Sequence, residues 1–324
     1  MNDSNFLKEI GRSYIVSAFL PAAIFVLLAY FLFRGFIPSA LLKQAGQAAL
    51  FHDYQWVVLF LLTAWLAFYL FSANDYTVRI FEGYLFPEWL KDLMAQRQRQ
   101  RVEEILKQIN SLHQARQDLL YQKEQDGYFD PDKAEQYTDD ILRLRTRLAN
   151  FSLQSPLSVK NVMPTRLGNI LRASEMYAYE RYRIEEITIW PRLFNVLPTE
   201  YIRTLEEKHN HFMFLINSAF LALSTALASL FFCLLGLPLL VSMPAMQYLS
   251  PKVAGFFTVG FDFVSPFGYF LISLALLGFG YVMYEIAVNS ARDLGAFICA
   301  SFDLYRGNLL TQMNWYPPKT ITDE

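Results

Sequence analysis

Four long apolar runs are the feature of this chain that most restricts its fold. They cover residues 14–33, 56–73, 212–241 and 266–289, and the only charged side chain among them is Glu285, near the end of the last run. A helix rises about 1.5 Å per residue, so about twenty residues cross a hydrocarbon core about 30 Å thick. Each run is therefore predicted to be a membrane-crossing helix, and together they predict two transmembrane hairpins.

The composition agrees with a chain that is only partly in water. Of its 324 residues, 54% are hydrophobic, 16% are aromatic and only 18% are charged. The first run is too long for a signal peptide and no small-residue cleavage site follows it. Pro21 lies inside this run, where it is predicted to remove one backbone hydrogen bond and to bend the helix.

Basic residues predict the orientation of the hairpins, because Lys and Arg resist translocation. Only three of the 28 Lys and Arg residues lie in residues 34–55 and 242–265, which join the two runs of each hairpin. Lys8 and Arg12 before the first run and Arg292 after the last run agree with this bias. We therefore expect a bacterial inner-membrane protein with both termini and the central domain in the cytosol.

The predicted fold is an all-α membrane protein with a mainly helical cytosolic domain between the second and third spans. Its predicted parts are a first transmembrane hairpin (1–74), a juxtamembrane segment and coiled-coil hairpin (75–157), an Arg/Glu/Tyr-rich junction (158–211), a second transmembrane hairpin (212–290) and an amphipathic cytosolic tail (291–324).

An antiparallel coiled-coil hairpin is predicted in the cytosolic domain. Apolar residues recur at 3-4 spacing in two charged segments, which is the pattern of a coiled-coil seam. Between them, Gly127 can end one helix, and Asp130 followed by Pro131 is a typical start for the next. The acids around Gly127 do not have the spacing of a calcium loop. Residues 93–153 are therefore a candidate surface for a cytosolic protein partner.

Residues 164–193 hold the densest set of arginine, glutamate and tyrosine side chains in the chain. Thr165 is placed to cap a helix that continues to about Tyr182, on which Arg172 and Glu175 are neighbours at i,i+3. Residues 187–190 have a β-like composition that ends at a proline, so a short extended segment is expected there.

Several motifs in this chain resemble a family of uncharacterised bacterial multi-spanning membrane proteins. The family pattern is a PTxLGN start, an ExYxxxRY core and a WPRL end, and the chain reads PTRLGN, EMYAYERY and WPRL within residues 164–193. FLPA at 19–22, NDYTVRIFEGY at 74–84 and FDLYR at 302–306 add to the resemblance. The resemblance implies a membrane protein and brings no assigned activity. The pattern has glycine where this chain has Arg183, which leaves open whether the chain turns tightly there.

Two interpretations of the dense segment remain open. Its arginines and acids can form a salt-bridged junction that ties the helical stalk to the membrane hairpins. Alternatively, they can bind an anionic ligand such as a nucleotide, with arginines on the phosphates and an aromatic ring stacked on the base. The residues of this candidate ligand site are Arg166, Arg172, Glu175, Tyr179, Arg181, Arg183 and Trp190.

Signals for enzymatic or metal chemistry are weak. The chain has no GxSxG, Walker A or HExxH motif. His209 and His211 would point to opposite sides of a helix, so they cannot share a metal ion. The net charge of −2 disfavours nucleic-acid binding. No catalytic residue, metal site, cofactor or disulfide is predicted.

Small residues in the third and fourth runs predict close packing of helices within the second hairpin or between subunits. Asn217, Ser224 and Thr225 are candidate pore-lining residues if subunits assemble around an axis. After the fourth run, apolar residues at helical spacing predict an amphipathic helix that continues the span or lies on the inner leaflet.

The sequence therefore predicts a non-enzymatic, homo-oligomeric membrane scaffold or sensor whose cytosolic helical domain binds a partner or an anionic ligand. Besides this partner, it contacts membrane lipid. The alternative is an oligomeric ion channel or pore that is gated from the cytosol.

Overall fold

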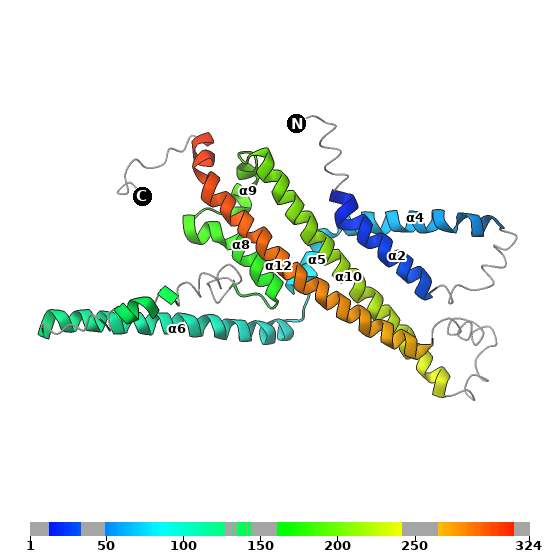
Figure 1. The fold of residues 1–324 in the computed structure, drawn as a ribbon, viewed down its shortest axis with the longest axis horizontal. Helices are drawn as coiled ribbons and strands as arrows, with labels where there is room; N and C mark the ends of the chain where they lie inside the picture. The colour runs from blue at the N-terminus through cyan, green and yellow to red at the C-terminus, as the bar shows by residue number, and fades with distance from the viewer. Residues whose placement is uncertain are drawn as a thin grey trace. The chain divides into compact units, whose positions relative to one another are not determined.

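The computed structural model describes most of the chain as helices. It covers residues 13–33, 49–126, 132, 135–140, 142–143, 161–241 and 265–313, and within these ranges it contains no β-strand (Figure 1). The chain divides into two compact units, which are described separately. Unit 1 contains Met1–Thr77 and His209–Ala287, and unit 2 contains Val78–Lys208 and Val288–Glu324.

The helices follow one another along the chain with short breaks, and α10 and α12 each contribute residues to both units. Their bounds are η1 Ile15–Phe19, α2 Leu20–Phe33, α4 Ala49–Ser72, α5 Asn74–Glu82, α6 Glu88–Asp126, α8 Arg166–Tyr182, α9 Glu186–Phe194, α10 Thr199–Val241 and α12 Pro266–Gln312.

Three helical segments in the described part of the chain are long and apolar enough to cross a membrane. They are Ile15–Phe33, Thr199–Leu235 and Pro266–Gln312. A fourth candidate exists if Trp56–Ser72 and Asn74–Glu82 count as one span, although the two helices meet at a bend of 62°. Because α5 carries Asp75, Arg79 and Glu82 after this bend, we place the end of the apolar segment at Ser72.

The core of unit 1 includes four buried alanines that come from three parts of the chain. Ala18 and Ala22, before and within α2, pack with Ala67 of α4 and Ala222 of α10, and all four are fully buried. Alanine lets helix backbones approach closely, which matters in a membrane because lipid provides no hydrophobic drive for helix association. The positions of these alanines therefore explain how α2, α4 and α10 pack together.

A π-helical turn, η1, ends at Phe19, two residues before Pro21 in α2. Proline has no backbone N–H, so Pro21 cannot donate to the carbonyl of Ser17 four residues earlier. The side-chain amide of Asn217 donates to this carbonyl instead, at 2.8 Å. The lost backbone bond predicted from the sequence is thus replaced by a bond from α10.

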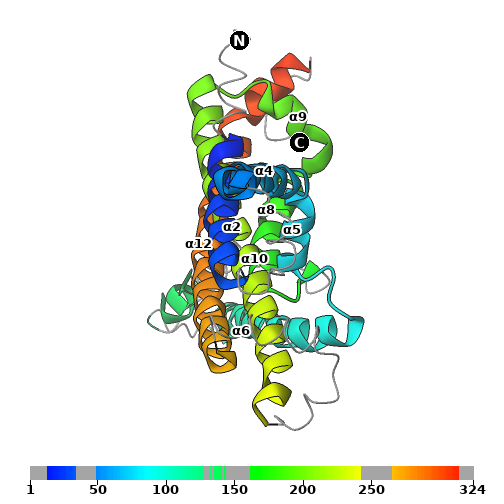
Figure 2. The same ribbon diagram turned by 90° about the vertical axis from the view of Figure 1, so that its right-hand side faces the viewer.

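Helices α10 and α12 approach closely within unit 1, and they lie side by side in both views (Figure 1 and Figure 2). Ser273 Oγ donates to the carbonyl of Ala226 at 3.0 Å. A Cβ atom on Gly280 would lie 3.2 Å from the side chain of Leu223, which is tighter than most Cβ contacts. These contacts confirm the predicted close packing within the second pair of apolar helices.

The core of unit 2 joins α8, α9 and the end of α12. Its buried members are Ala178, Leu193, Leu197, Phe302 and Leu309.

The expectation of a β-like segment at 187–190 is wrong, because these residues lie in α9, which also includes Pro191. Ile189, Trp190 and Phe194 pack against the unit 2 core, and their spacing puts them on one side of a helix. Burial of this face outweighs the β preference of the isoleucines, since packing routinely overrides local propensity.

The predicted coiled-coil hairpin is described only in part. Its first arm lies in α6, a continuous helix of 39 residues. The second arm lies largely outside the described residues, although 135–140 and 142–143 are helical. Asp140 and Arg143 line the same groove as Gln108, Ser111 and Leu112 of α6, which brings the two segments together.

The tail predicted after the fourth apolar run continues it without a break. Helix α12 runs for 47 residues, and its last part carries the buried Phe302 and Leu309 of the unit 2 core. Of the two alternatives left open by the sequence, the structure shows one helix that continues the fourth apolar run. Residues 314–324 lie outside the described part of the chain.

Candidate functional site

Helix α8 begins where the PTRLGN motif places its cap. Thr165 has an extended backbone, and its hydroxyl oxygen accepts from the N–H of Gly168 at 2.9 Å. The same hydroxyl donates to the carbonyl of Glu82 at the end of α5, at 3.0 Å. Thr165 therefore caps α8, as predicted, and also ties it to α5.

The two glycines at this contact are required by close approach. A Cβ atom on Gly168 would lie 2.7 Å from the carbonyl oxygen of Glu82, and one on Gly83 would lie 2.5 Å from the ring of Pro164. Gly83 also has a positive φ of 91°, which other residues rarely adopt. The glycines and Pro164 thus let α5 and α8 meet backbone to backbone.

Asn169 holds the chain segment that leads into α8. Its Oδ1 accepts from the N–H of Met163 at 2.7 Å, and its Nδ2 donates to the carbonyls of Met163 and Thr165, each at 2.9 Å. The side chain is almost completely buried. The PTRLGN motif is therefore a structural clamp in this chain.

Charged groups of both signs surround this clamp. Arg172 pairs with Glu175 at 3.2 Å on α8, which confirms the predicted i,i+3 neighbours. The pKa of Glu82 is raised to about 7, first by burial and then by the nearby Glu175 carboxylate, while Arg79 and Arg172 oppose the rise. The balance leaves Glu82 ready to change charge near neutral pH.

A second polar cluster lies toward the end of α8, where two tyrosines meet an aspartate of α12. The Tyr177 hydroxyl lies 2.9 Å from both carboxylate oxygens of Asp303, and the Tyr182 hydroxyl donates to Oδ1 of Asp303 at 2.5 Å. Burial raises the pKa of both hydroxyls, and the hydrogen bonds to Asp303 raise it further. Both tyrosines therefore keep their protons at neutral pH.

Guanidinium groups lie over the rings of this cluster. The Arg306 guanidinium carbon is 3.9 Å from the centre of the Tyr182 ring, and that of Arg181 is 5.7 Å from it. Arg181 is also 5.8 Å from the Tyr177 ring. These distances are in the range of cation–π contacts. Arg306 lies on α12 and Tyr182 on α8, so their contact helps to hold the two helices together.

The dense segment turns sharply at Arg183, which has a left-handed backbone with φ of 58°. Its N–H bonds to the carbonyls of Ala178 and Tyr179, and this ends α8. The chain therefore makes the tight turn that the sequence left open at Arg183, at the cost of a conformation that L-residues disfavour.

The residues of the candidate ligand site do not gather around one point. Arg172 pairs with Glu175, whereas Arg183 lies over the Tyr179 ring at 5.5 Å. Arg166 and Arg181 are exposed, at the first residue and in the last turn of α8. Trp190 is half-buried against Phe302, 6.0 Å between ring centres. The segment mainly joins α5, α8, α9 and α12 to one another.

The candidate pore-lining residues also have different environments. Asn217 is fully buried and donates to the carbonyl of Ser17 and to Asn74 Oδ1, at 2.8 and 3.2 Å. Ser224 is exposed and its hydroxyl donates to the carbonyl of Phe220 on its own helix, at 2.8 Å. Thr225 is half-buried.

Sequence reasoning missed Glu82, Tyr177, Tyr182, Asp303 and Arg306 as members of a site. All five lie in three of the motifs that stand out in the sequence: NDYTVRIFEGY, EMYAYERY and FDLYR. The contacts of these five residues all lie within unit 2. The three motifs were visible in the sequence, but only the folded structure shows which of their residues contact one another.

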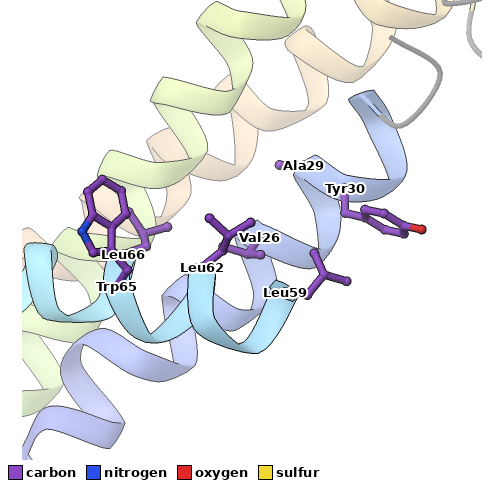
Figure 3. Close-up of a pocket in the computed structure, with 7 residues that line it drawn as sticks. All are labelled: Val26, Ala29, Tyr30, Leu59, Leu62, Trp65 and Leu66. Atoms are coloured by element: carbon purple, nitrogen blue, oxygen red, sulfur yellow. The ribbon is translucent and has the colours of Figure 1, made fainter. Parts of the chain in front are cut away.

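Unit 1 has a shallow apolar groove between α2 and α4 (Figure 3). Its volume is about 290 Å³. Because its lining is almost entirely hydrocarbon, the groove suits lipid chains better than a polar ligand. Its lining residues are Val26, Ala29, Tyr30, Leu59, Leu62, Trp65 and Leu66.

Among the described residues, no three His, Cys, Asp or Glu side chains are placed to hold a metal ion. Cys233 and Cys299 are buried and are not joined by a disulfide. Comparison of the chain with protein-family models, curated proteins and solved structures finds no match.

Proposed function

We propose that this protein is an integral membrane scaffold or sensor without enzymatic activity. In this proposal the four apolar segments form two transmembrane hairpins in a bacterial inner membrane, and unit 2 is a cytosolic module that receives a partner or ligand. The observation that carries the proposal is that α10 and α12 each run unbroken from an apolar segment into the folded core of unit 2.

The exposed surface of unit 1 supports a lipid environment. Trp65, Phe68 and Tyr69 of α4 are 68, 65 and 56% exposed, and Leu274 of α12 is 59% exposed. Many such side chains would be costly in water, whereas lipid solvates them. Neighbouring subunits of a homo-oligomer could cover part of the same surface.

The contacts within unit 2 support its proposed role as the module that binds a partner or ligand. Thr165, the cap of α8, bonds to the end of α5, and Asp303 of α12 accepts from Tyr182 of α8. Tyr201 of α10 donates to the carbonyl of Phe297 of α12 at 2.6 Å, so these bonds join α5, α8, α10 and α12. A ligand or partner that shifts α8 would thereby act on helices that continue into the apolar segments. The coiled-coil hairpin of residues 93–153 is the proposed docking element for a protein partner.

Partner capture in mild detergent tests the scaffold role. The tagged full-length protein should retain a stoichiometric cytosolic partner, and charge reversal of the exposed Glu103 and Glu104 on α6 should remove it. Reversal of Glu200 and Glu207 on α10 is the matched control and should leave capture unchanged. Equal capture by all three proteins, or no partner at all, would count against docking through α6.

Topology needs a separate test. Both native cysteines are buried, so single cysteines added at Asp92 and Gln96 of α6 would report on the side of the membrane. A membrane-impermeant thiol reagent should label them in inside-out vesicles and leave them unlabelled in intact spheroplasts. Labelling in spheroplasts would contradict a cytosolic unit 2.

A pore gated from the cytosol is the second candidate function. Asn217 favours it, because its Oδ1 atom is buried in an apolar segment and has no hydrogen-bond partner among the described residues. Polar groups within membranes often mark pathways for ions or polar solutes. Liposomes with the purified protein should then show ion flux that Asn217→Leu abolishes, and background flux in every condition would rule the pore out.

A further inference from the structure

The contact between α5 and α8 places a carboxyl group beside a like charge. The backbone carbonyl of Glu82 is held by the Thr165 hydroxyl and faces Gly168, with no room for a side chain between the helices. The Glu82 side chain is only partly exposed. A change in the charge of this side chain therefore affects the contact between α5 and α8.

Four groups surround the Glu82 carboxyl. Glu175 on α8 repels its charged form, while Arg79 on α5 and Arg172 on α8 attract it. Tyr84 is the neighbouring neutral titratable group, and burial together with Glu82 and Glu175 raises its pKa. Arg172 is already paired with Glu175 at 3.2 Å, so its attraction is shared between two carboxylates.

No N–H or hydroxyl donates to the Glu82 carboxylate among the residues that the structure describes. A partly buried carboxylate without donors and beside another carboxylate is costly, and proton uptake relieves that cost.

We propose that Glu82 is a proton-binding site that makes the contact between α5 and α8 depend on pH near neutrality. With the proton bound, the neutral carboxyl is not repelled by Glu175, and Thr165 and Gly168 stay in contact with the Glu82 carbonyl. Without it, repulsion and the cost of burying the charge weaken the contact. A change of pH would then be the stimulus for the proposed sensing role. Proton binding by Glu82 does not depend on that role, and only its biological meaning rests on it.

The direction of the effect follows from the raised pKa. The folded protein binds the proton more tightly than the unfolded chain, because burial and Glu175 raise the pKa of Glu82 from 4.5 to about 7. The contribution to stability is therefore fully present at pH below 4.5 and is lost as the pH rises through about 7. Exposure of the group to solvent reduces the size of this effect and leaves its sign unchanged.

Hydrogen exchange of the purified full-length protein tests the proposal. Amide protection in peptides that cover residues 164–172, corrected for the pH dependence of intrinsic exchange, should fall by about tenfold between pH 5 and pH 8. This is the change expected when screening by solvent reduces the effective pKa difference to about one unit. Glu82→Gln mimics the protonated group, so it should keep the protection at pH 8 that the wild type has at pH 5.

Two further variants make the test specific. Glu88→Gln is the matched control, because Glu88 is exposed and pairs with Lys91 at 2.8 Å, and it should keep the pH dependence of the wild type. Glu175→Gln removes the like charge and frees Arg172, so the midpoint should move to lower pH.

The proposal is overturned if Glu82→Gln keeps the pH dependence of the wild type, or if protection of residues 164–172 does not change between pH 5 and pH 8. If Glu82→Gln does not fold, an unmoved midpoint in Glu175→Gln overturns it. No partner is present in these measurements, so their failure is distinguishable from failure of partner capture by α6.

Discussion

The side-chain amide of Asn217 donates a hydrogen bond of 2.8 Å to the backbone carbonyl of Ser17, 200 residues earlier in the chain. Pro21 cannot donate a hydrogen bond to this carbonyl, because proline has no backbone N–H. The bond therefore links α10 to the π-helical turn before α2. It places a polar side chain in an apolar segment for a structural reason.

Replacement of Asn217 by alanine should destabilise unit 1 by about 1 kcal/mol, a typical value for a polar contact between membrane helices. The loss should be smaller in a Pro21→Ala background, because alanine at this position supplies the missing N–H. Thermal unfolding in detergent of the wild type, the two single variants and the double variant measures this coupling. An identical loss in both backgrounds would show that Asn217 does not compensate for Pro21.

Replacement of Arg183 by glycine should stabilise the protein by about 1 kcal/mol, because glycine adopts the left-handed conformation without steric cost. Arg192→Gly is the matched control: Arg192 is in α9 and also exposed, and glycine within a helix should cost about 1 kcal/mol. Melting temperatures of both variants in the same detergent test this. A lower melting temperature for Arg183→Gly would show that the Arg183 side chain contributes more than its backbone conformation costs.

Replacement of Gly168 by alanine should destabilise the contact between α5 and α8 by about 1–3 kcal/mol, the range for overpacking, because the new Cβ would meet the Glu82 carbonyl. Gly278→Ala is the control, since nothing lies within 4 Å of a Cβ atom there. It should leave stability unchanged or raise it by up to about 1 kcal/mol. Thermal unfolding and limited proteolysis near residue 83 measure both effects, and equal behaviour of the two variants would contradict the close approach.

Replacement of Asp303 by asparagine should cost about 1 kcal/mol, because the charged acceptor of two tyrosine hydroxyls is lost at an exposed position. Tyr177→Phe should cost less in the Asp303→Asn background than in the wild type. Asp293→Asn, at another exposed position on α12, should change stability by less than about 0.5 kcal/mol. A double-mutant cycle by thermal unfolding checks this, and additive losses would exclude coupling between Tyr177 and Asp303.

The sequence alone determined features that depend on neighbours along the chain. Length and apolarity predicted the candidate spans, because membrane crossing depends on one segment and its solvent. The cap at Thr165 and the pair of Arg172 with Glu175 followed from spacing, because a helix places i,i+3 residues together wherever it occurs. These predictions needed no knowledge of what packs against α8.

Only the tertiary structure decided which distant residues meet. Residues 187–190 form a helix because the core around Phe302 buries one face of α9, and composition alone favoured a strand. Asp303 joins Tyr177 and Tyr182 across more than a hundred residues. The charge of Glu82 depends on burial and on a carboxylate of another helix, and both arise only when α5 and α8 pack together, since desolvation and Coulomb interactions act through space.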